Sequence, residues 1–243
     1  TALRAVKFLC LSPAAFFFVA PMSESLFLLC TLGCMYLVRR DKMLPACLLG
    51  AYAAFTRSLG VVLIVPVVFE LVQRRAKLKD YLCVLIIPLG FAAYCLVNYT
   101  VSGDAFKFMQ YQREHWNQQL GWFFNTAAYQ TENAIYSASG NSVNFFGLWL
   151  PNLLAQALSL VLILFAVKRL RSSYTAYFLA YFIVAVGATW LLSAPRYLAA
   201  AFTVPPALAV ITHDRRADWC LTTLSVLAGA VYLCEFVLRW QVW

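Results

Sequence analysis

Long runs of apolar residues, each closed by a short cluster of Lys and Arg, follow one another along the whole chain. Runs such as 81–100 and 146–167 are long enough to cross a bilayer as helices, at about 1.5 Å per residue. Only 12% of the 243 residues are charged, compared with roughly 25% in soluble domains. These features predict an all-α, polytopic helical membrane protein, with residues 1–243 forming a single transmembrane domain.

Two apolar runs near the start, residues 8–21 and 25–38, are each only about half as long as a crossing. Between them lies Pro-Met-Ser-Glu-Ser, in which Glu24 interrupts hydrocarbon-like sequence. A carboxylate at that depth costs about 2.5–3.5 kcal/mol on insertion scales, so it usually faces a cavity or a partner. We expect a half-membrane hairpin with Glu24 at its turn; the alternative is a short surface turn in water.

The same pattern recurs in residues 44–56 and 61–72, which are separated by Arg57-Ser58-Leu59-Gly60. We predict a second hairpin with Arg57 at its turn. The alternative is a single helix over 44–73, kinked at Gly60, which would place Arg57 near mid-membrane. In the hairpin arrangement both turns face the same compartment, where an approach of Glu24 to Arg57 would lower the cost of burying either charge.

The later apolar runs predict full crossings, with one long polar segment among them. Residues 101–145 are rich in Gln, Asn, Ser and aromatic residues, which suit both a membrane interface and a sugar-binding surface. We expect this segment to be a long outer loop and residues 193–197 to be an outer turn. The predicted crossings are residues 81–100, 146–167, 174–192, 198–212 and 219–238.

The basic residues orient this arrangement, because cytoplasmic loops of membrane proteins are rich in Lys and Arg. Fourteen of the 19 basic residues fall in stretches predicted to be cytoplasmic, and five fall on the outer side. The net charge of +9 is therefore explained by membrane-flanking loops, and we expect no nucleic-acid partner. The outer five are Arg57, Lys107, Arg113, Arg196 and Arg239; the other fourteen are Arg4, Lys7, Arg39, Arg40, Lys42, Arg74, Arg75, Lys77, Lys79, Lys168, Arg169, Arg171, Arg215 and Arg216.

Motifs of soluble enzymes are missing from the sequence. It contains no P-loop, no G-x-G-x-x-G, no G-x-S-x-G and no His pair at metal spacing. Its eight cysteines fall mostly in apolar runs without a C-x-x-C pattern, which is typical of buried free thiols. We expect no metal site and no cofactor; a divalent metal is compatible with the sequence but not indicated by it.

Four segments, in order, resemble the PIG-V-type mannosyltransferases, which are multi-spanning glycosyltransferases of the GT-C type. Ser12 to Phe27 is similar to the family pattern N-P-x-S-x-F-x-x-x-x-Y-S-E-S-L-F, with Ser12 in place of Asn and Met22 in place of Tyr. Ala53 to Gly60 resembles A-x-x-x-R-x-x-G. Gly103-Asp104 with Phe106, Phe108, Gln112 and Trp116 resembles G-D-x-x-x-F…Q…W, and Pro195-Arg196-Tyr197 resembles a late P-R-Y/F turn.

The resemblance implies a GT-C fold and transfer of a hexose, mannose by analogy, from a polyprenyl (dolichyl) phosphate sugar. The acceptor would be a glycolipid or glycan on the outer or lumenal membrane face. No nucleotide is needed, in agreement with the missing motifs. The resemblance implies Glu24 as the catalytic candidate in this chain. The implied substrate-binding residues are Ser23, Ser25, Arg57, Ser58, Asp104, Gln112, Trp116, Arg196 and Tyr197.

The chain begins abruptly at Thr1, so we expect it to be the C-terminal part of a longer, N-terminally truncated GT-C protein. The resemblance places an essential acid, a catalytic Asp, in an outer loop that would precede Thr1. We expect the protein to be integral to a bacterial plasma membrane or an endoplasmic reticulum membrane. The competing hypothesis is a non-catalytic membrane module, either a transporter or a lipid-binding subunit, since transporters also contain broken helices and buried charges.

Overall fold

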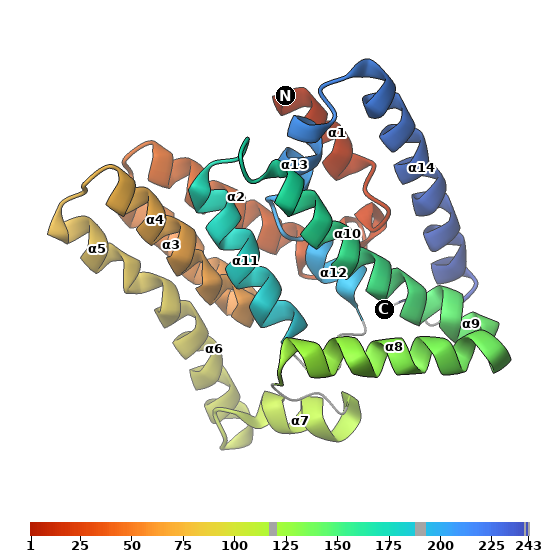
Figure 1. Ribbon diagram of the computed structural model, residues 1–243. Coiled ribbons are helices and arrows are strands. Elements are labelled where there is room, and N and C mark those ends of the chain that lie inside the picture. Colours follow the sequence, from red (N-terminus) through yellow and green to blue (C-terminus); the bar gives the residue numbers. More distant parts are fainter. Residues whose placement is uncertain (117–120, 188–192, 241, 243) are drawn as a thin grey trace.

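A computed structural model describes residues 1–116, 121–187, 193–240 and 242 of the chain. Within these ranges the chain is helical and contains no strand, and Figure 1 shows the helices in two groups, α2–α6 with α11 on one side and α1, α10 and α12–α14 on the other. The elements are α1 (Ala2–Cys10), η1 (Ala15–Phe18), α2 (Glu24–Arg39), α3 (Met43–Thr56), η2 (Ser58–Leu63), α4 (Ile64–Gln73), α5 (Leu78–Val84), α6 (Ile86–Ser102), α7 (Lys107–Trp116), α8 (Phe123–Gly140), α9 (Ser142–Asn144), η3 (Phe145–Trp149), α10 (Leu150–Ala166), α11 (Ser172–Val186), α12 (Ala194–Ala199), α13 (Val204–Ile211) and α14 (Arg215–Val237).

Three stretches are long and apolar enough to cross a membrane: Leu78–Ser102, Ser142–Ala166 and Arg215–Val237. They contain the predicted crossings 81–100 and most of 146–167 and 219–238, and they confirm a helical membrane protein. The first combines α5 with α6, and the second combines α9, η3 and α10. Three further apolar helices, Met43–Thr56, Ser58–Gln73 and Ser172–Val186, are shorter than these stretches.

The main core joins α2, α3, η2, α4 and α11 through buried side chains that include Phe27, Cys34, Leu63 and Tyr177. The arm 25–38 of the first predicted hairpin and both arms of the second supply most of this core. The first hairpin is not formed as predicted, because its arm 8–21 packs elsewhere: α1 lies against α13, and the buried Phe17 packs with Tyr232 of α14. A single helix over 44–73 is wrong, because Arg57 is extended (φ −148°, ψ 133°) and the chain turns back there. Gly60 packs on the backbone of α3 so closely that a Cβ would lie 2.3 Å from the Ala54 nitrogen. Only glycine permits this approach.

The predicted segments 8–21, 193–197 and 198–212 need corrected bounds, and each of them contains proline. Residues 8–21 are not one apolar half-crossing, because α1 ends at Cys10 and the chain from Leu11 is irregular around η1. Pro13 and Pro21 lack the N–H that would continue a helix. Of the predicted turn 193–197, only Ser193 lies outside helix α12, and 198–212 is split between α12 and the short α13. Pro195, Pro205 and Pro206 stand in the first turns of α12 and α13, where proline is tolerated.

The polar segment 101–145 is largely helical instead of an extended loop, with α7 and the 18-residue α8 inside it. In Figure 1, α8 runs across the lower ends of α10 and α11. Gln130 of α8 accepts a hydrogen bond from Gln156 of α10, and the Gly121 N–H donates to the Gly187 carbonyl at 2.7 Å. The segment is therefore anchored to the bundle. For the predicted crossing 174–192, residues 188–192 lie outside the described ranges.

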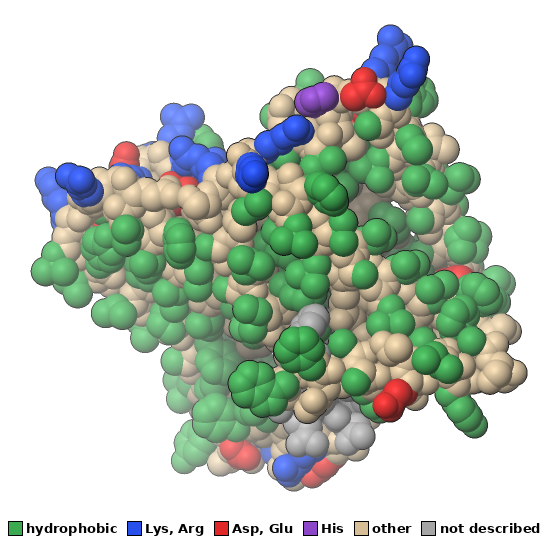
Figure 2. All heavy atoms as spheres, viewed as in Figure 1, with side chains coloured by type: hydrophobic (Ala, Val, Ile, Leu, Met, Phe, Trp, Pro, Cys, Tyr) green, Lys and Arg blue, Asp and Glu red, His purple; other side chains and the backbone are tan. Residues whose placement is uncertain are grey.

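Basic side chains gather along one edge of the molecule, over the α4–α5 link, the α10–α11 link and the start of α14 (Figure 2). Two polar contacts tie helices together near this edge. Arg169 donates to the Val210 carbonyl of α13 at 3.0 Å, and Lys7 of α1 pairs with Asp218 of α14 at 2.6 Å. We call this edge the basic face. The Lys and Arg residues in or next to these three segments include Arg74, Arg75, Lys168, Arg169, Arg171, Arg215 and Arg216.

Candidate active site

The expected approach of the two hairpin turns is confirmed by an ion pair between Glu24 and Arg57. Glu24 is the first residue of α2, and Arg57 lies in the extended link between α3 and η2. Arg57 Nη1 contacts Glu24 Oε1 and lies 3.5 Å from Ser23 Oγ. The Glu24 side chain is 2% exposed and that of Arg57 10% exposed. Glu24 therefore meets a cation within the protein, and the alternative of a surface turn in water is wrong.

A third charged residue, Arg196 of α12, reaches the same carboxylate oxygen. Its Nε lies 3.0 Å from Glu24 Oε1, an ion pair whose angle falls outside that of an aligned hydrogen bond. The Tyr197 ring lies beneath both guanidinium groups, 4.5 Å from Arg57 and 5.6 Å from Arg196. Ser23, Glu24, Arg57, Arg196 and Tyr197 form what we call the Glu24 cluster.

Helix α12 is held in place by two polar contacts that sequence reasoning missed. The Ala194 N–H, at the start of α12, donates to Asn152 Oδ1 of α10 at 2.7 Å. Tyr181 of α11 donates its hydroxyl to the Tyr197 carbonyl at 2.9 Å. Asn152 is 1% exposed, and a buried amide within an apolar run is the signal that would have marked it. These contacts position Arg196 over Glu24.

The charges of the Glu24 cluster are unbalanced. Two guanidinium groups face one carboxylate, so the cluster carries one excess positive charge. Glu24 Oε2 is buried and has no hydrogen-bond partner among the described residues. The cluster thus offers an attractive field for an anion and an acceptor for a hydroxyl group.

The other predicted site residues are not brought into the cluster by any described polar contact. Ser25 and Ser58 are exposed, at the starts of α2 and η2. Asp104 and Gln112 are exposed as well, and Asp104 Oδ1 accepts locally from the Phe106 N–H at 2.9 Å. Trp116 ends α7, but its side chain lies outside the described part of the structure. In the described ranges no group of three or more His, Cys, Asp or Glu side chains is arranged to hold a metal ion.

An apolar groove of about 490 Å³ borders the cluster at Pro195, the residue before Arg196. It lies between α10 and α14, and its walls include Leu154, Leu158 and Leu227. Glu235 is the only charged residue among those described along it. Helix α14 buries little of its surface in the protein. The groove beside it is therefore lined by apolar side chains that a long apolar chain could contact.

Comparison with known protein families gives a match for the sequence. The sequence model of the mannosyltransferase (PIG-V) family matches residues 1–180, which include Glu24 and Arg57 but not Arg196. Comparison with curated proteins gives no match, and comparison with solved structures gives none either. The matched part is well over half of the 243 residues. The chain therefore belongs to the mannosyltransferase (PIG-V) family.

Proposed function

We propose that this mannosyltransferase takes its sugar from a polyprenyl (dolichyl) phosphate mannose and transfers it to a glycolipid or glycan acceptor. The observation that carries the proposal is the Glu24 cluster, in which two arginines share one buried carboxylate. Arginine binds phosphate oxygens with two parallel N–H groups. The excess positive charge is suited to the phosphate that leaves the sugar.

In the proposed reaction, the bond between the sugar C1 and the phosphate oxygen breaks while the acceptor oxygen bonds to C1. Arg57 and Arg196 stabilise the negative charge left on the lipid phosphate. Glu24 is the catalytic carboxylate of the proposal: Oε1 holds both arginines, and Oε2 is the acceptor for a hydroxyl of the sugar or the acceptor. The acceptor hydroxyl gives its proton to Glu24 Oε2, so Glu24 is the general base of the proposal.

The apolar groove supports a lipid-linked donor. A polyprenyl chain lying between α10 and α14 would reach Pro195 and so bring its phosphate to Arg196. The proposal places this end of the helices on the outer or lumenal side of a bacterial plasma membrane or an endoplasmic reticulum membrane. The basic face then lies in the cytoplasm, as the charge rule for membrane loops requires.

The test compares donors with purified protein in proteoliposomes. We expect mannose transfer from polyprenyl phosphate mannose and none from a nucleotide-linked mannose. Arg57→Ala protein, prepared in the same way, is the negative control. Transfer from the nucleotide donor alone would refute the proposed donor, and transport of the lipid without transfer would favour a non-catalytic module.

A further inference from the structure

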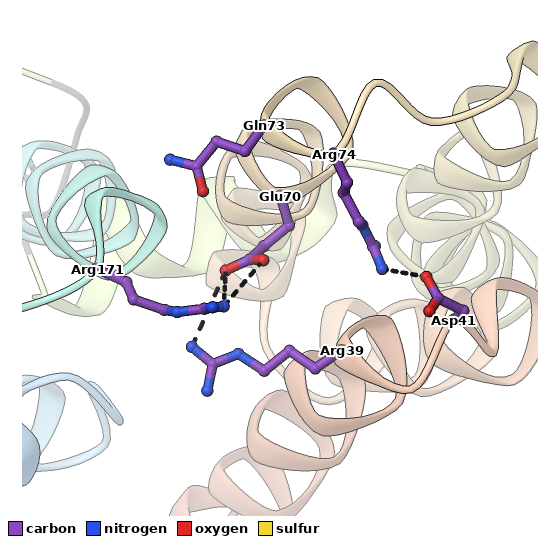
Figure 3. A pocket seen from close by; sticks show the side chains of 6 residues that line it. All are labelled: Arg39, Asp41, Glu70, Gln73, Arg74 and Arg171. Atoms are coloured by element: carbon purple, nitrogen blue, oxygen red, sulfur yellow. Dashed lines mark hydrogen bonds and ion pairs between the residues drawn. The ribbon is translucent and has the colours of Figure 1, made fainter.

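A second group of charged side chains surrounds the buried Glu70, at the other end of α2 from the Glu24 cluster. A pocket of about 510 Å³ lies there, and Figure 3 shows the side chains that line it. It is formed by the end of α2, the end of α4 and the residue before α11. We call it the Glu70 pocket; its lining residues are Arg39, Asp41, Glu70, Gln73, Arg74 and Arg171.

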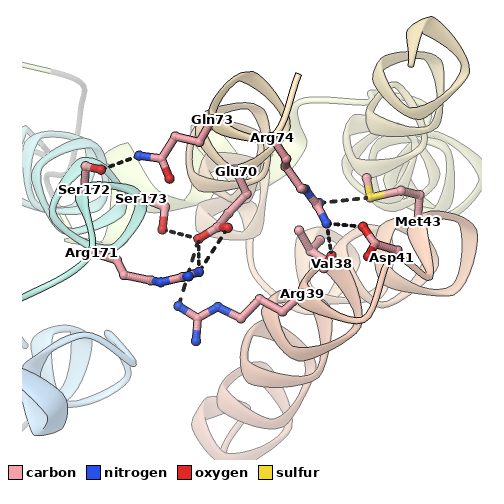
Figure 4. A network of polar contacts seen from close by, with 10 residues as sticks. All are labelled: Val38, Arg39, Asp41, Met43, Glu70, Gln73, Arg74, Arg171, Ser172 and Ser173. Atoms are coloured by element: carbon pink, nitrogen blue, oxygen red, sulfur yellow. Dashed lines mark hydrogen bonds and ion pairs between the residues drawn. The ribbon is translucent and has the colours of Figure 1, made fainter. Parts of the chain in front are cut away.

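Glu70 is 5% exposed and is well satisfied by its neighbours, as Figure 4 shows. Ser173 donates to Glu70 Oε1 at 2.6 Å, and Arg171 Nη1 lies 3.3 Å from both carboxylate oxygens. Arg74 is engaged separately, by an ion pair with Asp41 and a hydrogen bond of 2.8 Å to the Val38 carbonyl. The carboxylates of Glu70 and Asp41 are therefore both paired with cations of the pocket.

Arg39 is the remaining cation of the pocket. Its Nη2 lies 3.9 Å from Glu70 Oε1, beyond hydrogen-bond distance, and its guanidinium lies 4.7 Å from the centre of the Tyr174 ring. The structure gives it no hydrogen bond to any described residue. The side chains of Arg39 and Arg171 are 34% and 58% exposed. Three arginines against two carboxylates leave one excess positive charge, with donors available at the opening.

The pocket is separate from the proposed transfer site. Glu24 begins α2 and Arg39 ends it, so the two charged groups lie about 20 Å apart along that helix. A ligand in the Glu70 pocket therefore cannot be the sugar donor bound at the Glu24 cluster.

We propose that the Glu70 pocket binds the phosphate of an anionic phospholipid headgroup, with Arg39 and Arg171 as its donors. The pocket lies on the basic face, at the ends of membrane helices, where lipid headgroups are found. Basic pockets between helix ends on that side attract anionic lipids, and the arginine fork fits phosphate. A soluble phosphate would use the same groups, and the test separates the two sources.

Binding is measured on the purified protein by native mass spectrometry, with phosphatidylglycerol, phosphatidylcholine or inorganic phosphate as the probe. We compare wild type with Arg39→Ala and with Arg40→Ala. Arg40 is the matched control because it is an exposed neighbour that lies over Tyr36 and does not line the pocket. Arg39→Ala removes no hydrogen bond between described residues, so the variant should fold. Its thermal unfolding midpoint without lipid checks this.

We expect wild type and Arg40→Ala to bind phosphatidylglycerol at least about tenfold more tightly than phosphatidylcholine, and Arg39→Ala to lose this preference. Arg39→Lys keeps the charge without the guanidinium fork, so its preference for phosphatidylglycerol should lie between those of wild type and Arg39→Ala. Equal preference in Arg39→Ala and wild type, or none in wild type, would overturn the proposal. Displacement of the lipid by equimolar inorganic phosphate would overturn the lipid as the source. Sugar transfer is not measured, so the outcome is independent of the proposed function.

Discussion

At the residue scale, Glu24 combines near-complete burial with an oxygen shared by two arginines and a second oxygen that has no described partner. A carboxylate used only to neutralise charge would normally have both oxygens satisfied when it is buried. This second oxygen is therefore the atom to which the proposed function assigns a substrate hydroxyl.

The first prediction is that Glu24→Gln lowers mannose transfer per folded molecule by about 10²-fold, because the charge and one acceptor oxygen are lost. Removing one partner of a buried ion pair also destabilises a protein by about 3–5 kcal/mol. Glu24→Asp keeps the charge on a shorter side chain, so it should fold as wild type does and still lose at least about tenfold in transfer. Glu132→Gln, on the exposed face of α8, is the matched control. Near-normal turnover of folded Glu24→Gln would remove this residue from the centre of the site.

The second prediction concerns the arginine fork. Arg57→Lys and Arg196→Lys should reduce transfer nearly as much as the corresponding Ala variants, because Lys cannot hold phosphate with two parallel N–H groups. We expect at least about a tenfold loss in each case, with the charge-assisted hydrogen bonds as the cause. Transfer rates at increasing donor concentration give the measurement, and exposed Arg113→Lys of α7 is the control. Full activity in both Lys variants would exclude a phosphate clamp.

At the scale of the element, α12 depends on Asn152 for its position. The third prediction is that Asn152→Leu destabilises the protein by about 1–3 kcal/mol, because the buried Ala194 N–H loses its acceptor. Transfer should fall as well, since Arg196 is carried by α12. Thermal unfolding and transfer are measured on the same preparations, with Asn125→Leu at an exposed position of α8 as the control. Unchanged stability and transfer would show that α12 is held by other contacts.

The packing of α3 on α6 gives the fourth prediction. A Cβ on Gly90 would lie 1.7 Å from the Ala51 carbonyl oxygen, whereas a Cβ on Gly140 would meet no atom within 4 Å. Gly90→Ala should therefore force the helices apart and cost about 1–3 kcal/mol, while Gly140→Ala should stay within about 0.5 kcal/mol of wild type. Unfolding midpoints in detergent distinguish the two. Equal midpoints would mean that α6 shifts without cost.

The elements also show what could be predicted from the sequence. Glu24 and Arg57 each interrupt an apolar run at a turn, so their approach followed from the hairpin pattern. Glu70 gives the same signal inside 61–72 but was missed, because no turn marks it. The hydrogen bond from Ala194 to Asn152 joins residues 42 apart, and no local pattern specifies such a pair. Helices α7 and α8 were not predicted, because a long polar segment between apolar runs is typical of a loop.

At the scale of the whole molecule, the two charged groups lie at opposite ends of helix α2. The Glu24 cluster is at the start of α2, and the Glu70 pocket is at its end, on the basic face. Because Lys and Arg are retained on the cytoplasmic side of membranes, this polarity predicts one orientation for the whole chain. Residues 101–145 should share a compartment with the Glu24 cluster.

The fifth prediction tests that orientation with single cysteines in a background in which all eight native cysteines are replaced. Ser25→Cys and Ser58→Cys, exposed beside the Glu24 cluster, should react with a membrane-impermeant maleimide from the same side as Asp104→Cys. Lys42→Cys and Lys77→Cys should react only when the opposite side is opened to the reagent, because they flank the basic helix ends. If Ser25→Cys or Ser58→Cys is labelled from the same side of the membrane as Lys77→Cys, the predicted topology is wrong. Such labelling would also place the Glu24 cluster on the cytoplasmic side, where the proposed lipid-linked donor could not serve it.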